Sequence, residues 1–112
     1  QFGDNDLLAA KLAKIFKADL LIMLSAVEGL YDSFNNQTNQ STLIRQVSKV
    51  TKNIHAMAGK ASKSGKGGMT SKIEAAKIML SMNSDMVISK GDAANPLIRL
   101  KKSAQSTWFN KA

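Results

Sequence analysis

The sequence predicts an α/β fold in a single domain spanning residues 1–112, and three observations lead to this prediction. An amphipathic helical pattern runs directly into a short, continuously apolar segment at 19–25, which is typical of a strand in a parallel sheet. A second segment that is predicted as a strand, at 85–91, follows another helical pattern. A chain of 112 residues with 44% hydrophobic residues buries one modest core, so we expect helices and strands in layers around it.

The first predicted helix covers residues 5–17, with lysines interleaved between apolar residues at helical spacing. Its apolar residues are Leu8, Leu12, Ile15 and Phe16. The cluster at 4–6 stands at its start, where capping oxygens and negative charge are favoured. The segment 19–25 is predicted as a strand buried on both faces of a parallel sheet, and Glu28 and Gly29 mark the turn after it.

The polar segment 31–42 predicts an exposed loop or a hairpin excursion. Residues 43–57 predict a short extended piece that leads into a second helix ending near Gly59. A third helix follows the glycine-rich loop, with a stripe formed by Ile73, Ala76 and Leu80. The remaining expected elements are a strand at 85–91, a turn at Asn95 and Pro96, and a last strand at 106–109 whose Trp108 and Phe109 face opposite sides.

Sixteen Lys and Arg residues against eight Asp and Glu residues give a net charge of +8, which favours anionic partners without choosing among them. Cysteine is absent, so disulfides and thiolate metal sites are excluded, and we expect a cytoplasmic protein. No apolar run approaches the ~20 residues of a membrane span. The N-terminal "QFGDND" lacks a signal pattern, and we interpret the sequence as one that begins in the middle of a protein.

The loop "KASKSGKGGMTSK" at 60–72 matches neither the Walker A motif nor the dinucleotide-binding fingerprint. Gly65, Gly67 and Gly68 permit positive φ and close approach, so successive N–H groups can converge on an anion before a helix. Ser71 and Glu74 fit a capping box, which places Lys72 in the first helical turn, against the macrodipole. On these residues alone, a basic linker and a phosphate cradle both remain open.

Two blocks narrow this choice. "FGDNDLLAAKLAKIFKADLLIMLSAVEGLYD" at 2–32 and "SGKGGMTSKIEAAKIM" at 64–79 resemble the second half of the kinase domain of the glutamate 5-kinases, a branch of the amino-acid kinase family. The ending "STWF" at 106–109 resembles the close of that domain. The resemblance implies a three-layer α/β/α sandwich with a mainly parallel sheet, of which this chain is the C-terminal, nucleotide-binding part only.

The same resemblance implies transfer of the γ-phosphoryl group of ATP, with Mg²⁺, to the side-chain carboxylate of L-glutamate, the step that opens proline biosynthesis. Asp6 resembles the aspartate that orients catalytic lysines, and Lys72 resembles the lysine that steadies the transferring phosphoryl group. Asn5 and Asp4 resemble residues that contact the glutamate substrate. We expect no protein metal ligands, a homo-oligomer, and no nucleic-acid or membrane partner.

The resemblance also implies an ATP-binding set at the end of the first strand and in the glycine-rich loop. Its members are Ser25, Ala26, Lys66, Gly67, Gly68, Met69, Thr70, Ser71 and Lys72. The chain departs from the family at Ala26, where an aspartate is usual, and at Lys66, where threonine or arginine is usual. The first glycine-rich loop of the family belongs to an N-terminal half that these residues do not include, so we expect the segment alone to be inactive.

Three alternatives stay open. One is a non-catalytic kinase-like subunit, because Ala26 replaces a carboxylate. Another is the kinase segment of a bifunctional pyrroline-5-carboxylate synthase, and the third is a basic nucleic-acid-binding module, which lacks interleaved aromatic residues here. His55 has no second ligand at metal spacing and is predicted as a solvent-facing or partly buried helix residue. Core packing is expected of the methionines in and after the third helix, Met79, Met82 and Met86.

Overall fold

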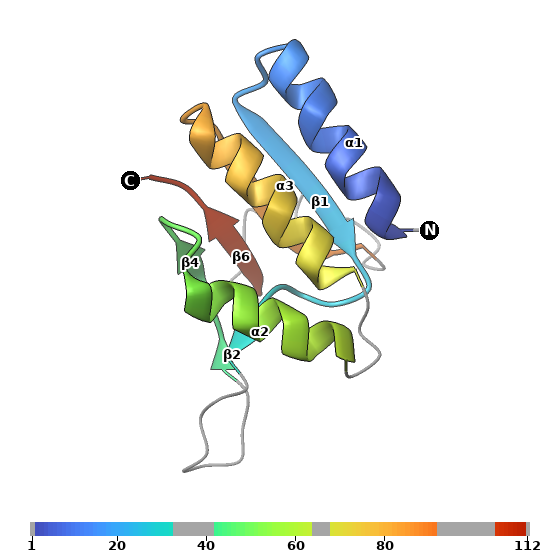
Figure 1. Cartoon of the computed structure of the whole chain (residues 1–112), viewed down its shortest axis with the longest axis vertical. Coiled ribbons are helices and arrows are strands. Elements are labelled where there is room, and N and C mark those ends of the chain that lie inside the picture. Colours follow the sequence, from blue (N-terminus) through green and yellow to red (C-terminus); the bar gives the residue numbers. More distant parts are fainter. Residues whose placement is uncertain (1, 33–41, 64–67, 92–104, 112) are drawn as a thin grey trace.

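The computed structural model describes residues 2–32, 42–63, 68–91 and 105–111, without the side chains of 2–4 and 61–63. Figure 1 shows the helices beside the strands of a twisted sheet. In chain order the elements are α1 (Phe2–Ile15), β1 (Leu20–Ser25), β2 (Tyr31–Asp32), β3 (Thr42–Leu43), β4 (Gln46–Val47), α2 (Lys52–Lys63), α3 (Met69–Ser81), β5 (Asp85–Lys90) and β6 (Ser106–Phe109).

The main sheet has four described strands in the order β1-β5-β6-β4. The pairs β1 with β5 and β4 with β6 are parallel, whereas β5 and β6 are antiparallel, so the predicted mainly parallel sheet is confirmed. β4 lies inside the extended piece expected at 43–57. The short pair of β2 and β3 is antiparallel, which confirms the hairpin alternative for 31–42, although residues 33–41 lie outside the described part.

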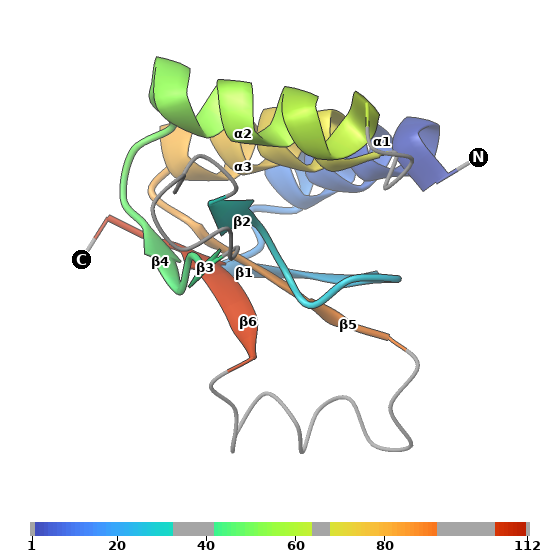
Figure 2. The same cartoon turned by 90° about the horizontal axis from the view of Figure 1, so that it is seen from below.

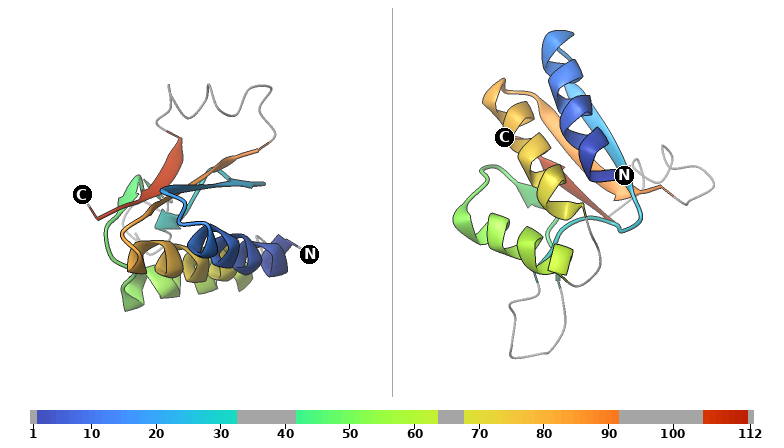
Figure 3. Two further views of the ribbon diagram at one scale, coloured as in Figure 1. Left: turned by 90° about the horizontal axis from the view of Figure 1, so that it is seen from above. Right: turned by 45° about the vertical axis from the view of Figure 1, so that its right-hand side comes forward.

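The described helices form one layer on one face of the sheet. Figure 2 shows α1, α2 and α3 together on that side, and the left panel of Figure 3 shows the same separation from the opposite direction. The second helical layer of the expected three-layer sandwich is not among the described residues. The turn predicted at Asn95 and Pro96 lies outside them too.

The core lies between α3 and the sheet. The predicted stripe of α3 is confirmed, because Ile73, Ala76 and Leu80 are at most 5% exposed. Met79, Met86 and Phe109 are fully buried beside them, and Met82 packs partly against the same cluster. The core role predicted for the methionines is therefore confirmed. Phe109 is fully buried and Trp108 only half-buried, which agrees with the prediction that they face opposite sides of the strand.

The apolar stripe predicted for the first helix faces away from this core. α1 packs against α3 through the small residues Ala10 and Ala13, which are buried. Their small side chains let the two helices approach closely. β1 was predicted to be buried on both faces, and this is wrong for the described structure, since its outer face has no covering layer there. The large hydrophobic residues that remain 37–78% exposed are Leu8, Leu12, Ile15, Phe16, Leu20, Ile22 and Leu24.

α2 continues past its predicted end. Gly59 lies inside the helix, which reaches Lys63, and a Cβ atom added there would meet nothing within 4 Å. The helix begins after Thr51, whose Oγ1 accepts a hydrogen bond of 3.3 Å from the backbone N–H of Ile54, as an N-cap does. One glycine therefore did not stop the helix, because a glycine inside a helix costs only about 1 kcal/mol.

The turn after β1 is fastened to the last strand by one hydroxyl group. The Oγ1 atom of Thr107 accepts a hydrogen bond of 2.9 Å from the Leu30 N–H and donates one of 2.6 Å to the Ile44 carbonyl. A Cβ atom on Gly29 would lie 2.2 Å from the same oxygen. The turn predicted at Glu28 and Gly29 therefore needs glycine for close approach.

Candidate functional site

The candidate site is formed where α3 begins. Gly68 precedes the helix with φ 92° and ψ −8°, a left-handed conformation that glycine adopts without steric cost. The helix starts at Met69, so the predicted capping box is wrong: Ser71 lies within the first turn, and Glu74 contacts His55 and Lys77 instead. The backbone N–H of Lys72 donates to the Gly68 carbonyl at 3.1 Å and closes that first turn.

A buried ion pair connects this helix start to the start of α1. The ammonium Nζ of Lys72 lies 3.0 Å from Oδ2 of Asp6, and the two side chains are only 6% and 13% exposed. The residues are 66 positions apart in the sequence. A lysine at a helix N-terminus opposes the macrodipole, whereas a carboxylate there is favoured, so Asp6 offsets the unfavourable position of Lys72.

Ser71 completes the cluster from the same turn of α3. Its Oγ lies 2.9 Å from Oδ2 of Asp6 and 2.8 Å from the Gly68 carbonyl oxygen. A hydroxyl group has one proton, so Ser71 donates to one of these two acceptors at a time, and the carboxylate is the stronger. This contact between Ser71 and Asp6 was not anticipated, because nothing in the sequence pattern places position 6 beside position 71.

Lys72 retains hydrogen-bonding capacity that its neighbours do not use. An ammonium group has three N–H donors, and Asp6 is the one acceptor for them within the described part of the chain. Nζ also lies beside Gly68, 3.5 Å from the point where a Cβ atom would stand. Lys72 is therefore a nearly buried cation beside Gly68, with two donors that have no acceptor among the described residues.

The other residues predicted to bind ligands near the start of α3 differ in how far they are buried. Asn5 is exposed on α1. Met69 is 2% exposed and belongs to the core, so only its backbone can face a ligand, and Thr70 is exposed. The Asp4 side chain and residues Lys66 and Gly67 lie outside the described part.

Ser25 and Ala26 lie at the carboxyl end of β1. The Oγ of Ser25 accepts a hydrogen bond of 3.3 Å from the Val27 N–H, and its carbonyl accepts one of 2.8 Å from the Gly91 N–H. Ala26 is exposed. Among described residues, no hydrogen bond or ion pair joins Ser25 or Ala26 to Asp6, Ser71 or Lys72.

The described carboxylates do not build a metal centre of their own. Within the four described ranges, no three His, Cys, Asp or Glu residues lie together as a possible metal-ligand group. Asp6 is held by Lys72 and Ser71. In phosphoryl-transfer sites Mg²⁺ is usually bound through one or two carboxylates together with substrate phosphates, so the phosphates of a bound nucleotide would supply ligands that the described residues do not.

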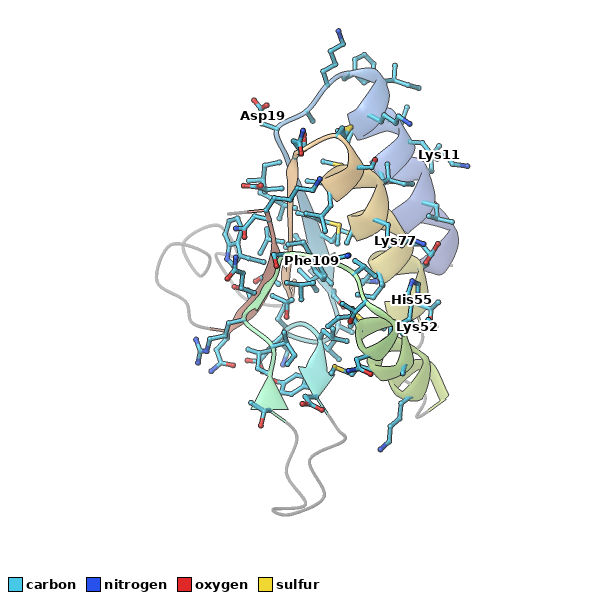
Figure 4. The ribbon with its side chains drawn as sticks, turned by 60° about the vertical axis from the view of Figure 1, so that its left-hand side comes forward. Lys11, Asp19, Lys52, His55, Lys77 and Phe109 are labelled. Carbon is cyan, nitrogen blue, oxygen red and sulfur yellow. The ribbon has the colours of Figure 1, made fainter. Side chains whose placement is uncertain are left out.

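His55 occupies the helix surface, as predicted. Its Nε2 lies 3.3 Å from Oε2 of Glu74 on α3, with both side chains more than a third exposed. Figure 4 shows His55 and Lys77 on the outer side of the helix layer. No helix in the described part has the length and apolar character to cross a membrane.

Comparisons with known proteins identify the family of the chain. The model of the amino acid kinase family matches residues 1–90. The chain belongs to this family. The glutamate 5-kinase of Nitrobacter hamburgensis is 44% identical over 110 residues, which are 97% of this chain and 29% of that protein. The chain thus spans less than a third of the length of this curated relative.

Solved structures show the amino acid kinase fold. The carbamate kinase of Giardia lamblia, solved with bound AMP-PNP, superposes with a TM-score of 0.62 at 18% identity, over 96% of this chain and 32% of that chain. The UMP kinase of Ureaplasma parvum gives 0.60 at 18% identity, over 95% of this chain and 41% of that one. The predicted α/β fold class is thereby confirmed.

Proposed function

We propose that this chain supplies the nucleotide-binding half of a kinase that transfers the γ-phosphoryl group of ATP to the side-chain carboxylate of L-glutamate. A carboxylate oxygen of glutamate forms the new bond to the γ-phosphorus, and the bond from that phosphorus to the bridging oxygen breaks, which releases ADP. The product, glutamyl 5-phosphate, opens proline biosynthesis. The identity to a protein named glutamate 5-kinase supports this choice of substrates.

The observation that carries the proposal is the state of Lys72. It is a nearly buried cation beside a glycine in the left-handed region, with one donor used by Asp6 and two donors without an acceptor among the described residues. Phosphoryl transfer depends on positioning and on neutralising charge that spreads over the phosphoryl oxygens. We assign Lys72 to those oxygens and Asp6 to holding the ammonium in place.

The surrounding residues take the remaining roles in the proposal. The backbone N–H groups of 66–71, next to the positive end of α3, bind the ATP phosphates, and Ser25 and Ala26 contact the nucleotide at the end of β1. Asn5 and Asp4 bind the glutamate. Mg²⁺ enters with the ATP phosphates and neutralises part of their charge.

The exposed apolar face supports a further part of the proposal. Seven large hydrophobic residues are exposed, four of them in or directly after α1 and three in β1, and large exposed apolar surfaces usually mark an interface. We propose that the N-terminal half of the kinase domain, with its own phosphate-binding loop and glutamate contacts, covers this face. The complete enzyme acts in the cytoplasm as a homo-oligomer.

A chimera tests this function. Residues 1–112 replace the matching 110-residue segment of the Nitrobacter hamburgensis enzyme, and glutamate-dependent ADP formation is measured with Mg²⁺ and ATP. We expect activity in the chimera and none in the 112-residue chain alone. A folded chimera without activity would contradict the proposal.

The second candidate is a non-catalytic kinase-like subunit, favoured by the alanine at position 26. It predicts that the same chimera binds ATP and forms no ADP. Replacing Ala26 with Asp then separates the two candidates further. If activity appears only in the Ala26→Asp chimera, the alanine at position 26 is the reason that the natural sequence does not form ADP.

A further inference from the structure

A second cationic feature lies at the opposite end of α3 from Lys72. A hollow of about 200 Å³ is lined by three lysines, Lys49, Lys77 and Lys111, by Ser48, and by Leu80 and Ser81 at the end of the helix. Eight residues of α-helix separate Lys72 from Leu80, which is about 12 Å along the axis. Figure 1 shows β4, the last turn of α3 and the C-terminal end of the chain together on this side.

The charges around the hollow are of one sign. None of the lining residues is acidic. The carboxylate that reaches toward it is Glu74, whose Oε2 lies 3.8 Å from Nζ of Lys77 and 3.3 Å from His55. Within the described ranges, Lys49 and Lys111 form no ion pair. Three lysines of like charge line the same hollow, and a bound anion would offset their mutual repulsion.

The shape of the hollow limits the class of anion. Its volume of about 200 Å³ is enough for a phosphate group with a small organic part. Leu80, 5% exposed, supplies an apolar wall. The Ser81 hydroxyl donates a hydrogen bond of 2.6 Å to the Ile78 carbonyl, which leaves the three lysines and Ser48 as the other side-chain donors among the lining residues.

We propose that this hollow is a binding site for a small phosphate-bearing anion, separate from the phosphoryl-transfer site. The three lysines hold the phosphate oxygens by charge-assisted hydrogen bonds, and Leu80 contacts the carbon atoms of a phosphomonoester. The site stands at the end of the same helix that carries Lys72, and it does not require Lys72 for binding.

Isothermal titration and amide NMR with inorganic phosphate and with glycerol 3-phosphate test the proposal on the 112-residue chain carrying Lys72→Met. This background removes the competing cation of the transfer site. We expect saturable binding of both ligands, with shifts centred on Ser48, Leu80 and Lys111. Tighter binding of glycerol 3-phosphate identifies a phosphomonoester as the ligand, and equal affinities identify free phosphate.

The double variant Lys49→Gln/Lys111→Gln should weaken binding at least about fivefold. The matched control is Lys11→Gln/Lys14→Gln, which makes the same change in net charge at exposed positions of α1, and it should leave the affinity unchanged. Circular dichroism verifies that both variants fold. Equal weakening in the two pairs, shifts confined to 68–72, or an absence of saturation would each overturn the proposal, and none of these results bears on phosphoryl transfer.

Discussion

Removing the Asp6 charge should destabilise the fold through Lys72. In Asp6→Asn the amide keeps an oxygen for Lys72 and Ser71, but the ammonium group, in a side chain only 6% exposed, loses its counter-charge. Breaking a buried ion pair from one side costs about 3–5 kcal/mol. Because Asp6 is 13% exposed and water reaches this edge, we expect the lower end, about 3 kcal/mol. That is a large part of the free energy of unfolding of a typical domain, which is ~5–15 kcal/mol.

The converse variant should cost less. In Lys72→Met the Asp6 carboxylate still accepts a hydrogen bond from the Ser71 hydroxyl and retains some contact with water. We therefore expect the free energy of unfolding to fall by about 1 kcal/mol. The double variant Asp6→Asn/Lys72→Met removes both charges and should be more stable than Asp6→Asn alone. The predicted coupling energy between the two positions is therefore about 2 kcal/mol.

Urea unfolding of the four proteins, followed by circular dichroism and by fluorescence of Trp108, measures this coupling. The double-mutant cycle isolates the interaction of the pair from the separate effects of each substitution. If the two single losses add to within about 0.5 kcal/mol in the double variant, Asp6 does not stabilise the charge of Lys72, and the description of the site is wrong.

Two further predictions concern the turn that follows β1. Gly29→Ala places a Cβ atom 2.2 Å from the Thr107 oxygen and should lower the free energy of unfolding by about 2–4 kcal/mol; its matched control Gly59→Ala, in open space on α2, should raise that energy by up to about 1 kcal/mol. Urea midpoints measure both, and equal effects would contradict the packing described. Thr107→Val removes the acceptor of the Leu30 N–H and the donor to the Ile44 carbonyl, which should cost about 1–3 kcal/mol; a midpoint equal to that of the wild-type chain would show that this hydroxyl does not fasten the turn.

Local sequence patterns predicted helices and strands well where the spacing of apolar residues matches the residues that are buried. The stripe of Ile73, Ala76 and Leu80 identified the core face of α3, and the strand at 106–109 was predicted with its observed bounds. Patterns did not predict which face of α1 packs. Its larger apolar residues indicated one face, whereas the close contact with α3 uses Ala10 and Ala13, and alanines carry little weight in a hydrophobic pattern.

The candidate site was predictable in part. The resemblance named Asp6 and Lys72 as partners, and the structure brings them to 3.0 Å, a distance that local periodicity cannot give for positions 66 residues apart. The capping box failed because Gly68, in a left-handed conformation, starts the helix earlier. That left Ser71 inside the first turn, where its hydroxyl meets Asp6. The catalytic and substrate roles of these residues stay predictions.

The central claim is that Lys72 steadies the transferring phosphoryl group. Its most direct test is the glutamate-dependent kcat of the chimera carrying Lys72→Met, compared with the same chimera carrying Lys11→Met at an exposed position of α1. We predict a fall of about a hundredfold or more for Lys72→Met and no change for Lys11→Met. A folded Lys72→Met chimera that keeps its full kcat would contradict the claim.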